Sequence, residues 1–243
     1  MALGNEIRKA RIVFRFALDQ GLIHDPVRYG QSFRMPGKKV LLQARHDRGP
    51  KMFEAKQIRA MLAAATQPLK TMILLGVNCG FGPTDCSRLP LSAVDLKTGW
   101  VDYPRPKTGQ RRRVPLWKET AKALQEAVRT RPTPRNPTDG DLVFLTVTGR
   151  SVNPEHDEPF RQLVKALGFH RPGLGLYTLR YVFETIGGDS RDQVAVDAIM
   201  GHSRGDMASV YRERISDDRL RAVVDHVQTW LFGQAVDQNG DKR

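Results

Sequence analysis

Apolar residues recur at helical spacing along most of the chain beyond residue 52. Ile58, Met61, Leu62 and Ala65 fall on one face of a helix, and 72–77 is a short apolar run suited to burial. The same spacing predicts further helices, which cover 120–128, 176–186, 193–200, 207–214 and 220–232. These segments together predict a compact and mainly helical domain.

Short strands are predicted in the middle of this domain. The segments 100–103 and 113–116 flank the sequence PRPKTGQRR, in which Lys-Thr-Gly is typical of a hairpin turn. Another short strand is predicted over 141–146 (DLVFLT), after a proline-rich surface loop at 131–140. The expected fold class is therefore α+β, mainly α, with a small antiparallel sheet.

The first fifty residues have a different pattern. Apolar residues from Leu3 to Leu18 predict a helix over 5–20, which Gly21 ends. The segment 34–51 contains Pro, Gly, a histidine and six Lys or Arg, which is typical of a linker. A single helix and a linker cannot bury a core of their own, so the apolar face of this helix needs an oligomeric or other partner. We expect domain boundaries at 1–50, 51–235 and a polar tail at 236–243 that lacks fixed structure.

Composition excludes several classes of protein. The chain has 243 residues, 40% of them hydrophobic and 27% charged, which is typical of globular proteins. No apolar run reaches the roughly 18–20 residues that span a bilayer, and the N-terminus lacks the apolar core of a signal peptide. Cys79 and Cys86 are too few for a disulfide framework and lack the further ligands of a zinc site. We therefore expect a cytoplasmic protein that does not span a membrane.

Charge narrows the choice of partner. Lys and Arg number 39 against 26 Asp and Glu, so the net charge is +13, and the first candidate partner is a nucleic acid. An anionic membrane surface is the second candidate. Residues 1–52 carry eleven of the basic residues and four of the acidic ones. Arg8, Arg11 and Arg15 share one face of the predicted helix, which is either a solvated face or a DNA contact.

Three segments contain candidate chemistry: PRPKTGQRRRVPL (104–116), LYTLRYVF (176–183) and MGHSRGDMASVY (200–211). Taken singly, Lys107 is an ordinary turn lysine, and Arg180 is a helix arginine paired with Glu184 one turn on. Gly201 is likewise an ordinary helix C-cap, followed by an exposed His202. These explanations are strong one by one and much weaker for the whole set.

Jointly the segments resemble the catalytic domain of the tyrosine recombinases, also called the phage integrase family. Tyr177-Thr-Leu-Arg180 corresponds to the family's His-x-x-Arg box. Gly201-His202 corresponds to its Gly-His pair, and Tyr211, nine positions beyond His202, corresponds to its nucleophilic tyrosine. The order and the spacing of these motifs make the similarity specific.

The family's hairpin lysine matches Lys107 in Lys-Thr-Gly, ahead of the Val-Pro-Leu at 114–116. The similarity covers roughly residues 50–235. It implies that 51–235 is a tyrosine recombinase catalytic domain, preceded by a partial helical core-binding segment. The implied substrate is double-stranded DNA, and the implied chemistry requires neither a metal nor another cofactor.

The resemblance also implies a role for each residue. Arg180 would bind two phosphate oxygens with its planar guanidinium, and His202 would donate a further hydrogen bond. Lys107 would protonate the leaving 5′ oxygen as general acid. Tyr211 would attack phosphorus and form a covalent 3′-phosphotyrosine. Tyr177 stands where the family has a histidine, and it can hydrogen-bond but is a poor base near neutral pH.

This chain departs further from the family pattern in the first box. That box aligns on 79–89 and places Gly82 at its arginine, while Asp85 keeps the acidic character of the box. Loss of one transition-state donor costs roughly 100- to 1000-fold in rate. Arg88 would face another side of the helix, so Arg105, beside the hairpin lysine, is the better-placed substitute.

The N-terminal part is shorter than the family's helical core-binding domain, so either the start is truncated or the clamp on DNA is reduced. Family behaviour implies a tetramer on paired DNA sites, with the helix near 220–232 exchanged between neighbours. The residues expected to contact DNA are Arg8, Arg11, Arg15, Lys38, Lys39, Arg105, Arg111, Arg112, Arg113 and Arg204.

The leading hypothesis is a site-specific recombinase or integrase that cuts and rejoins DNA. A catalytically impaired DNA-binding relative is the first alternative, because of Gly82. A topoisomerase-like nicking and closing enzyme is the second. An unrelated cationic binding module is the third.

Overall fold

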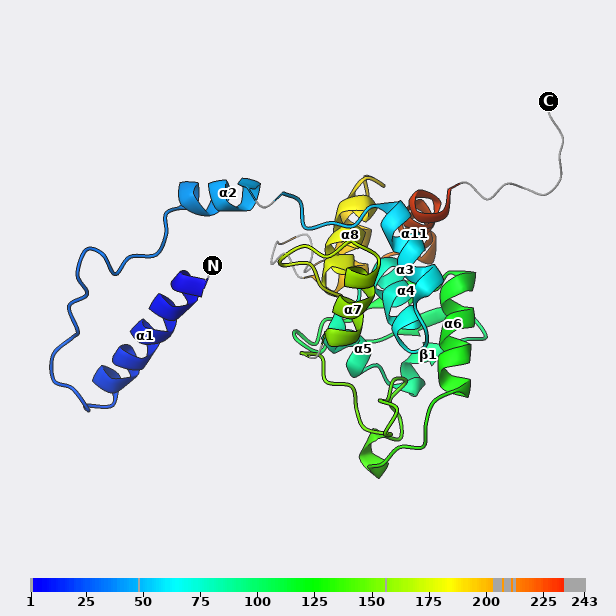
Figure 1. The fold of residues 1–243 in the computed structure, drawn as a ribbon, viewed down its shortest axis with the longest axis horizontal. Coiled ribbons are helices and arrows are strands. Elements are labelled where there is room, and N and C mark those ends of the chain that lie inside the picture. Colours follow the sequence, from blue (N-terminus) through cyan, green and yellow to red (C-terminus); the bar gives the residue numbers. More distant parts are fainter. Residues whose placement is uncertain are drawn as a thin grey trace. The chain divides into compact units, whose positions relative to one another are not determined.

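The computed structural model describes residues 2–47, 49–155, 157–202, 207, 211 and 213–233 (Figure 1). The chain divides into two units, Met1–Pro50 and Lys51–Arg243. None of the described helices is long and apolar enough to cross a membrane. Half of the helix predicted over 207–214, and the whole polar tail at 236–243, lie outside the described residues.

The first unit contains α1 (Ala2–Asp19) and α2 (Lys38–Asp47). The segment after α1 folds back on it: Arg11 donates to the carbonyl of Phe33 at 3.0 Å, and Tyr29 stacks on the Phe33 ring. Ile7 is thereby buried. The linker expected over 34–51 is wrong in part, because 38–47 is rich in good helix formers and forms α2, although none of its side chains is buried.

The second unit is mainly helical, as predicted. It contains α3 (Ala55–Ala64), α4 (Leu69–Cys79), α5 (Pro83–Ser87), α6 (Lys118–Arg129), α7 (Glu158–Ala166), α8 (Thr178–Gly188), α9 (Gln193–Met200) and α11 (Asp217–Phe232), with short 3-10 turns at Leu91–Ala93 and Pro137–Asp139. The sequence analysis missed α5 and α7. For α7 a signal was present, because Phe160 and Val164 are one turn apart and both are buried.

A small antiparallel sheet lies beside these helices, in the order β1 (Val94–Asp95), β2 (Trp100–Asp102) and β3 (Arg113–Pro115). The hairpin of β2 and β3 is confirmed, and its register pairs Val101 with Val114, both buried. The strand predicted over 141–146 is wrong. Three consecutive buried residues, Val143, Phe144 and Leu145, lack the alternation of a half-buried strand, and the segment makes only isolated bridges.

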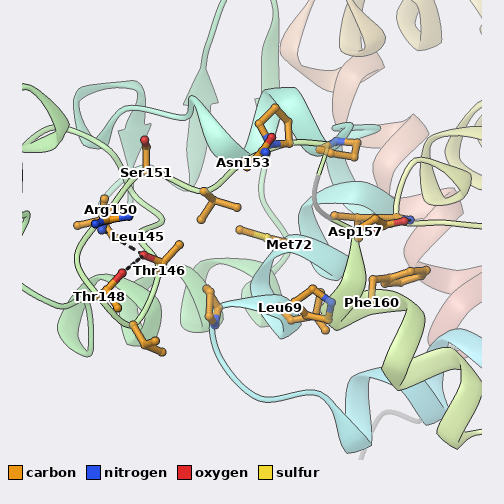
Figure 2. Close-up of a pocket in the computed structure, with 17 residues that line it drawn as sticks. Leu69, Met72, Leu145, Thr146, Thr148, Arg150, Ser151, Asn153, Asp157 and Phe160 are labelled. Atoms are coloured by element: carbon orange, nitrogen blue, oxygen red, sulfur yellow. Dashed lines mark hydrogen bonds between the residues drawn. The ribbon is translucent and has the colours of Figure 1, made fainter.

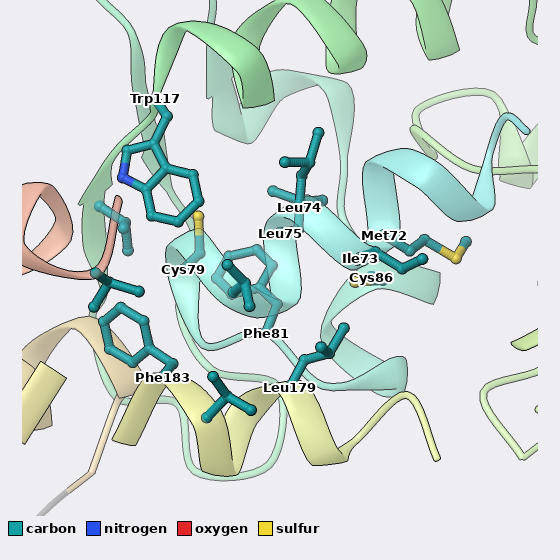
Figure 3. Close-up of a cluster of buried hydrophobic side chains, with 14 of the residues drawn as sticks. Met72, Ile73, Leu74, Leu75, Cys79, Phe81, Cys86, Trp117, Leu179 and Phe183 are labelled. Carbon is teal, nitrogen blue, oxygen red and sulfur yellow. The ribbon is translucent and has the colours of Figure 1, made fainter. Parts of the chain in front are cut away.

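The core of the second unit forms where α4 packs on α8 (Figure 3). Every residue of α4 from Thr71 to Cys79 is buried, so this part of the helix is covered on all sides. The two helices approach closely at Gly76, where a Cβ would lie only 2.8 Å from the Cβ of Leu179. This close contact sets the position of α8, which carries Arg180.

The C-terminal helix α11 belongs to the same core. Its apolar stripe is buried, as the residues Leu220, Val223, Val224, Val227 and Leu231 show. The helix packs against α3, α8, α9 and β3 of its own chain. The exchange of this helix between neighbours, which the family resemblance implies, stays a prediction.

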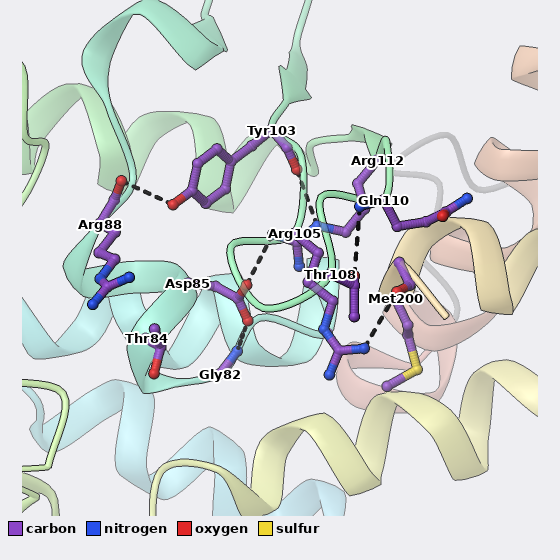
Figure 4. Close-up of polar contacts among 12 residues, drawn as sticks. Gly82, Thr84, Asp85, Arg88, Tyr103, Arg105, Thr108, Gln110, Arg112 and Met200 are labelled. Atoms are coloured by element: carbon purple, nitrogen blue, oxygen red, sulfur yellow. Dashed lines mark hydrogen bonds and ion pairs between the residues drawn. The ribbon is translucent and has the colours of Figure 1, made fainter. Parts of the chain in front are cut away.

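A buried ion pair ties the hairpin to α5 (Figure 4). The guanidinium of Arg112 donates to Asp85 at 2.9 Å and to the carbonyl of Tyr103 at 3.0 Å. It lies 4.5 Å from the centroid of the Phe81 ring, and the whole residue is 1% exposed. The expectation that Arg112 contacts DNA is therefore wrong, because its charge is neutralised inside the protein.

The neighbours of Arg112 in the sequence have different surroundings. Arg113 forms an ion pair with Asp217, and its guanidinium lies 3.9 Å from the centroid of the Trp100 ring. Arg111 is exposed. Of three consecutive arginines, Arg112 is therefore buried, Arg113 is paired and Arg111 is exposed. Successive residues of a strand face opposite sides, which is why Arg112 and Arg113 have different surroundings.

We expect Gly76→Ala to destabilise the protein by up to about 2 kcal/mol. Alanine gains about 1 kcal/mol in helix propensity, but overpacking against Leu179 costs about 1–3 kcal/mol. Urea denaturation measures the difference. Gly188→Ala is the control, since a Cβ there meets its nearest atom at an ordinary 3.5 Å; equal stability of both variants would contradict the close packing.

We expect Arg112→Met to lower the free energy of unfolding by about 3–5 kcal/mol, because it leaves the carboxylate of Asp85 buried without its cation. Arg111→Met removes the same charge from an exposed position of the same hairpin and is expected to cost little. Chemical denaturation of the two variants measures this. Equal stability would show that the buried pair does not hold the hairpin in place.

Candidate active site

Arg180 is the centre of the candidate site. It lies in the first turn of α8, and its residue is 2% exposed. Its guanidinium donates to the carbonyls of Gly80, which ends α4, and Met200, which ends α9, the latter at 2.7 Å. Burial is the main cause that lowers the pKa of this guanidinium, and the charge of Arg105 is the next. An arginine still keeps its charge in such surroundings.

His202 lies directly against Arg180. The Nη2 of Arg180 is 2.9 Å from the Nε2 of His202. The histidine follows Gly201, a C-cap in the left-handed conformation (φ 63°) that ends α9 as the sequence analysis allowed. Burial lowers the pKa of His202 below its ordinary value, and Arg180 lowers it further.

Two carboxylates face the other nitrogen of His202. The Nδ1 atom lies 3.5 Å from Oε2 of Glu184 and 3.8 Å from Oδ1 of Asp197. Both carboxylates raise the pKa of His202, against the effects of burial and of Arg180. The sequence analysis missed this role. Glu184 was considered only as a partner of Arg180, whereas an acid on an otherwise apolar helix was itself a usable signal.

The same cluster is the candidate for a metal site. Among the described residues, Glu184, Asp197 and His202 bring three atoms that can bind a metal within 4.8 Å of one another. A metal ion there would be repelled by Arg180, which contacts the same imidazole. The cluster is therefore better suited to hydrogen bonding around His202 than to metal binding.

Arg105 joins this site from the hairpin. Its guanidinium donates to the carbonyl of Gly201 at 3.2 Å, one residue before His202. Its charge lowers the pKa of both Arg180 and His202, which places a second guanidinium in the electrostatic neighbourhood of the first. The structure thus brings Arg105, the expected substitute for the first-box arginine, together with Arg180 and His202.

Gly82 and Tyr177, the two departures from the family pattern, lie in contact. A Cβ on Gly82 would meet the Tyr177 ring at 3.2 Å, so the ring occupies the space beside the missing side chain. The amide of Gly82 donates to Asp85 at 2.7 Å (Figure 4). Tyr177 also packs edge-on against Tyr181. The two substitutions therefore belong to one rearranged corner of the site.

The remaining site residues are placed less closely. Lys107 is exposed in the turn of the hairpin. Tyr211 is 76% exposed, and among the described residues no hydrogen bond joins it to Arg180 or His202. Arg204 lies outside the described residues, so its expected DNA contact stays a prediction.

The basic residues of the first unit lie on its surface. Arg8, Lys38 and Lys39 are exposed. Arg11 is exposed but is used to hold the returning segment, and Arg15 pairs with Asp19 at 3.0 Å. Exposure is required for contact with a phosphate backbone, and these positions meet that requirement.

A cavity of about 500 Å³ lies elsewhere in the second unit (Figure 2). Its lining is mostly apolar and includes Leu69, Met72, Leu145, Val152 and Phe160. Burial raises the pKa of Asp157 at its edge. Among the described residues, none of the candidate site residues lines this cavity, and Arg150 is the one cation in its lining.

The structure resembles those of DNA recombinases. The Tn1549 transposon integrase in complex with circular intermediate DNA matches with a TM-score of 0.61 and 18% identity, over 92% of this chain and 78% of that chain. The XerA recombinase matches with a TM-score of 0.55 and 21% identity, over 77% and 67%. The XerH site-specific recombinase bound to difH substrate matches with a TM-score of 0.54 and 17% identity, over 71% and 53%.

Similarity at these identities shows the fold, and the fold is the one expected from the sequence: mainly helical, with a small antiparallel sheet. No curated protein matches the chain by sequence. The model of the phage integrase family matches residues 51–216, more than half of the chain and nearly all of the part that holds the site. The chain therefore belongs to the phage integrase family, the tyrosine recombinases.

Proposed function

We propose that this protein is a site-specific recombinase or integrase that cleaves and rejoins double-stranded DNA through a covalent 3′-phosphotyrosyl intermediate. Membership of the family supports a role in recombination. The observation that carries the proposal is the cluster of Arg180, His202 and Arg105 around one place. Such a concentration of donors suits the charge that develops on a phosphodiester.

The proposed chemistry divides among four groups. Arg180 and Arg105 bind the non-bridging oxygens of the scissile phosphate, and His202 donates a further hydrogen bond. The hydroxyl of Tyr211 gives its proton to solvent water and attacks phosphorus, so an oxygen–phosphorus bond to the tyrosine forms while the bond to the 5′ oxygen breaks. Lys107 gives its proton to the leaving 5′ oxygen. A 5′ hydroxyl of a second strand reverses these steps and releases Tyr211.

The exposure of Lys107 and Tyr211 agrees with a site that is completed on DNA. A lysine in a hairpin turn and an exposed tyrosine can both approach a phosphate that docks over Arg180. Exposed cations of the first unit, and Arg111 of the second, would bind the DNA phosphate backbone. We propose that the protein acts in the cytoplasm as a tetramer on paired DNA sites, as the family implies.

A DNA-binding relative without turnover is the second candidate function. The contact between Gly82 and Tyr177 favours it, because the aromatic ring stands where the family pattern has an arginine and a histidine. Both candidates require DNA binding that weakens steeply with salt. They differ in whether Tyr211 forms a covalent bond.

We expect a suicide substrate, a nicked duplex that carries the protein's recombination site, to trap a covalent adduct with the wild-type protein and not with Tyr211→Phe. The phenylalanine has no oxygen to attack phosphorus. Tyr181→Phe is the control, because it removes the hydroxyl of another partly exposed tyrosine and is expected to leave adduct formation unchanged. Denaturing gels measure the adduct, and its absence from the wild-type protein would decide for the impaired relative.

We expect Arg105→Ala to slow adduct formation by roughly 100- to 1000-fold, the usual effect of losing one transition-state donor. Arg105→Lys keeps the charge but not the planar fork, so we expect it to recover only part of the rate. Single-turnover kinetics at saturating protein measure these rates. Arg111→Ala, in the same hairpin, controls for lost DNA affinity; an unchanged rate in Arg105→Ala would contradict its role as the second phosphate ligand.

A further inference from the structure

His202 is held between a guanidinium on one side and two carboxylates on the other. Arg180 lies 2.9 Å from its Nε2. Glu184 and Asp197 face its Nδ1 at 3.5 Å and 3.8 Å. The three partners come from α8 and α9, so side chains of these two helices hold His202 in place.

This arrangement determines where the proton of a neutral His202 resides. A guanidinium has only donors, so the Nε2 atom that contacts Arg180 must accept and cannot bear a proton. The proton of the neutral ring is then on Nδ1, where it points at the two carboxylates. In this tautomer His202 has no Nε2–H to donate to a DNA phosphate.

The two carboxylates are themselves oriented by one amide. The Nε2 of Gln193 donates to Oε1 of Glu184 at 2.9 Å and to Oδ1 of Asp197 at 3.2 Å. The other oxygen of Glu184, Oε2, is buried and has no hydrogen-bond partner among the described residues. A buried acceptor without a donor is costly, and the Nδ1 of His202 lies 3.5 Å from it.

We propose that Glu184 and Asp197 are positioning residues that hold His202 as the Nδ1–H tautomer in the free protein and stabilise its imidazolium when a phosphate docks. The stabilisation of the imidazolium rests on the proposed function, since it concerns the phosphate that Arg180 binds. A coupled proton is thereby added to that function. On docking, the Nη2 of Arg180 turns from Nε2 to a phosphate oxygen, Nε2 takes one proton from solvent, and the new N–H donates to a phosphate oxygen.

The charges that face His202 explain the coupling. Arg180 and Arg105 disfavour its protonation, as does burial, whereas Glu184 and Asp197 favour it. A docked phosphate brings negative charge to the two arginines and cancels their repulsion. The carboxylates stay in place, so the balance then favours the imidazolium, which donates from both nitrogens.

The first test needs no DNA. The protein labelled with nitrogen-15 in its six histidines is titrated by NMR, and His202 is assigned by comparison with His202→Gln. We expect the neutral ring to carry its proton on Nδ1. In Glu184→Gln combined with Asp197→Asn, the pKa of His202 falls further because two favourable charges are lost, and the preference for Nδ1–H weakens.

Asp189→Asn is the matched control, an exposed acid at the end of α8 that is not among the charges acting on His202. It should change neither the tautomer nor the pKa. A neutral wild-type ring protonated on Nε2 would overturn the proposal without any variant. So would a carboxylate variant, folded by circular dichroism, in which His202 titrates as in the wild type.

The second test uses sulfate, an anion of constant charge across the titration, against chloride at equal ionic strength. We expect sulfate to raise the pKa of His202 in the wild type, and to raise it to a lower final value in the carboxylate variant. An unchanged pKa with sulfate would overturn the coupling. These measurements do not depend on cleavage. A protein that forms no adduct but shows the Nδ1–H tautomer would contradict the proposed function and still support the positioning role.

Discussion

The guanidinium of Arg180 occupies the point at which α4 and α9 end, and the rest of the site depends on its hydrogen bonds there. It donates to Gly80 and Met200, the terminal carbonyls of those two helices, and it contacts His202 just beyond. Helix ends leave carbonyls without intrahelical partners, and a buried cation satisfies them. The residue that would bind the scissile phosphate is therefore also the residue that joins three helices, which fixes its position before DNA arrives.

A second buried guanidinium supports the opposite side of the site. Arg112 ties the hairpin to Asp85, and its side chain passes so close to Gly201 that a Cβ there would lie 2.8 Å from it. The hairpin that carries Arg105 is thus anchored to the turn that carries His202. In this way the protein keeps two guanidinium groups near one place, although position 82 contributes none. We propose that the hairpin, and not the neighbouring helix, supplies the guanidinium that position 82 lacks.

Much of this could be predicted from the sequence. Local periodicity predicted the helices around Arg180, and the Lys-Thr-Gly turn predicted the hairpin, because both depend on neighbouring residues. The resemblance to the tyrosine recombinase family predicted that Arg180 and His202 belong to one site. The burial of Arg112 could not be predicted, since it depends on Asp85, which lies 27 residues away and on another element. The contacts of Glu184 and Asp197 with His202 likewise depend on how α8 and α9 cross.

We propose that Arg180 and Arg105 together form the phosphate clamp of this protein, in which position 82 is a glycine. A crystal structure of the protein on its DNA site with vanadate, which mimics the five-coordinate phosphorus of the transition state, tests it most directly. The account predicts both guanidinium groups within hydrogen-bond distance of the equatorial oxygens, with Tyr211 at one apex. Arg105 still bound to the carbonyl of Gly201, with vanadate held by Arg180 and another cation, would contradict it.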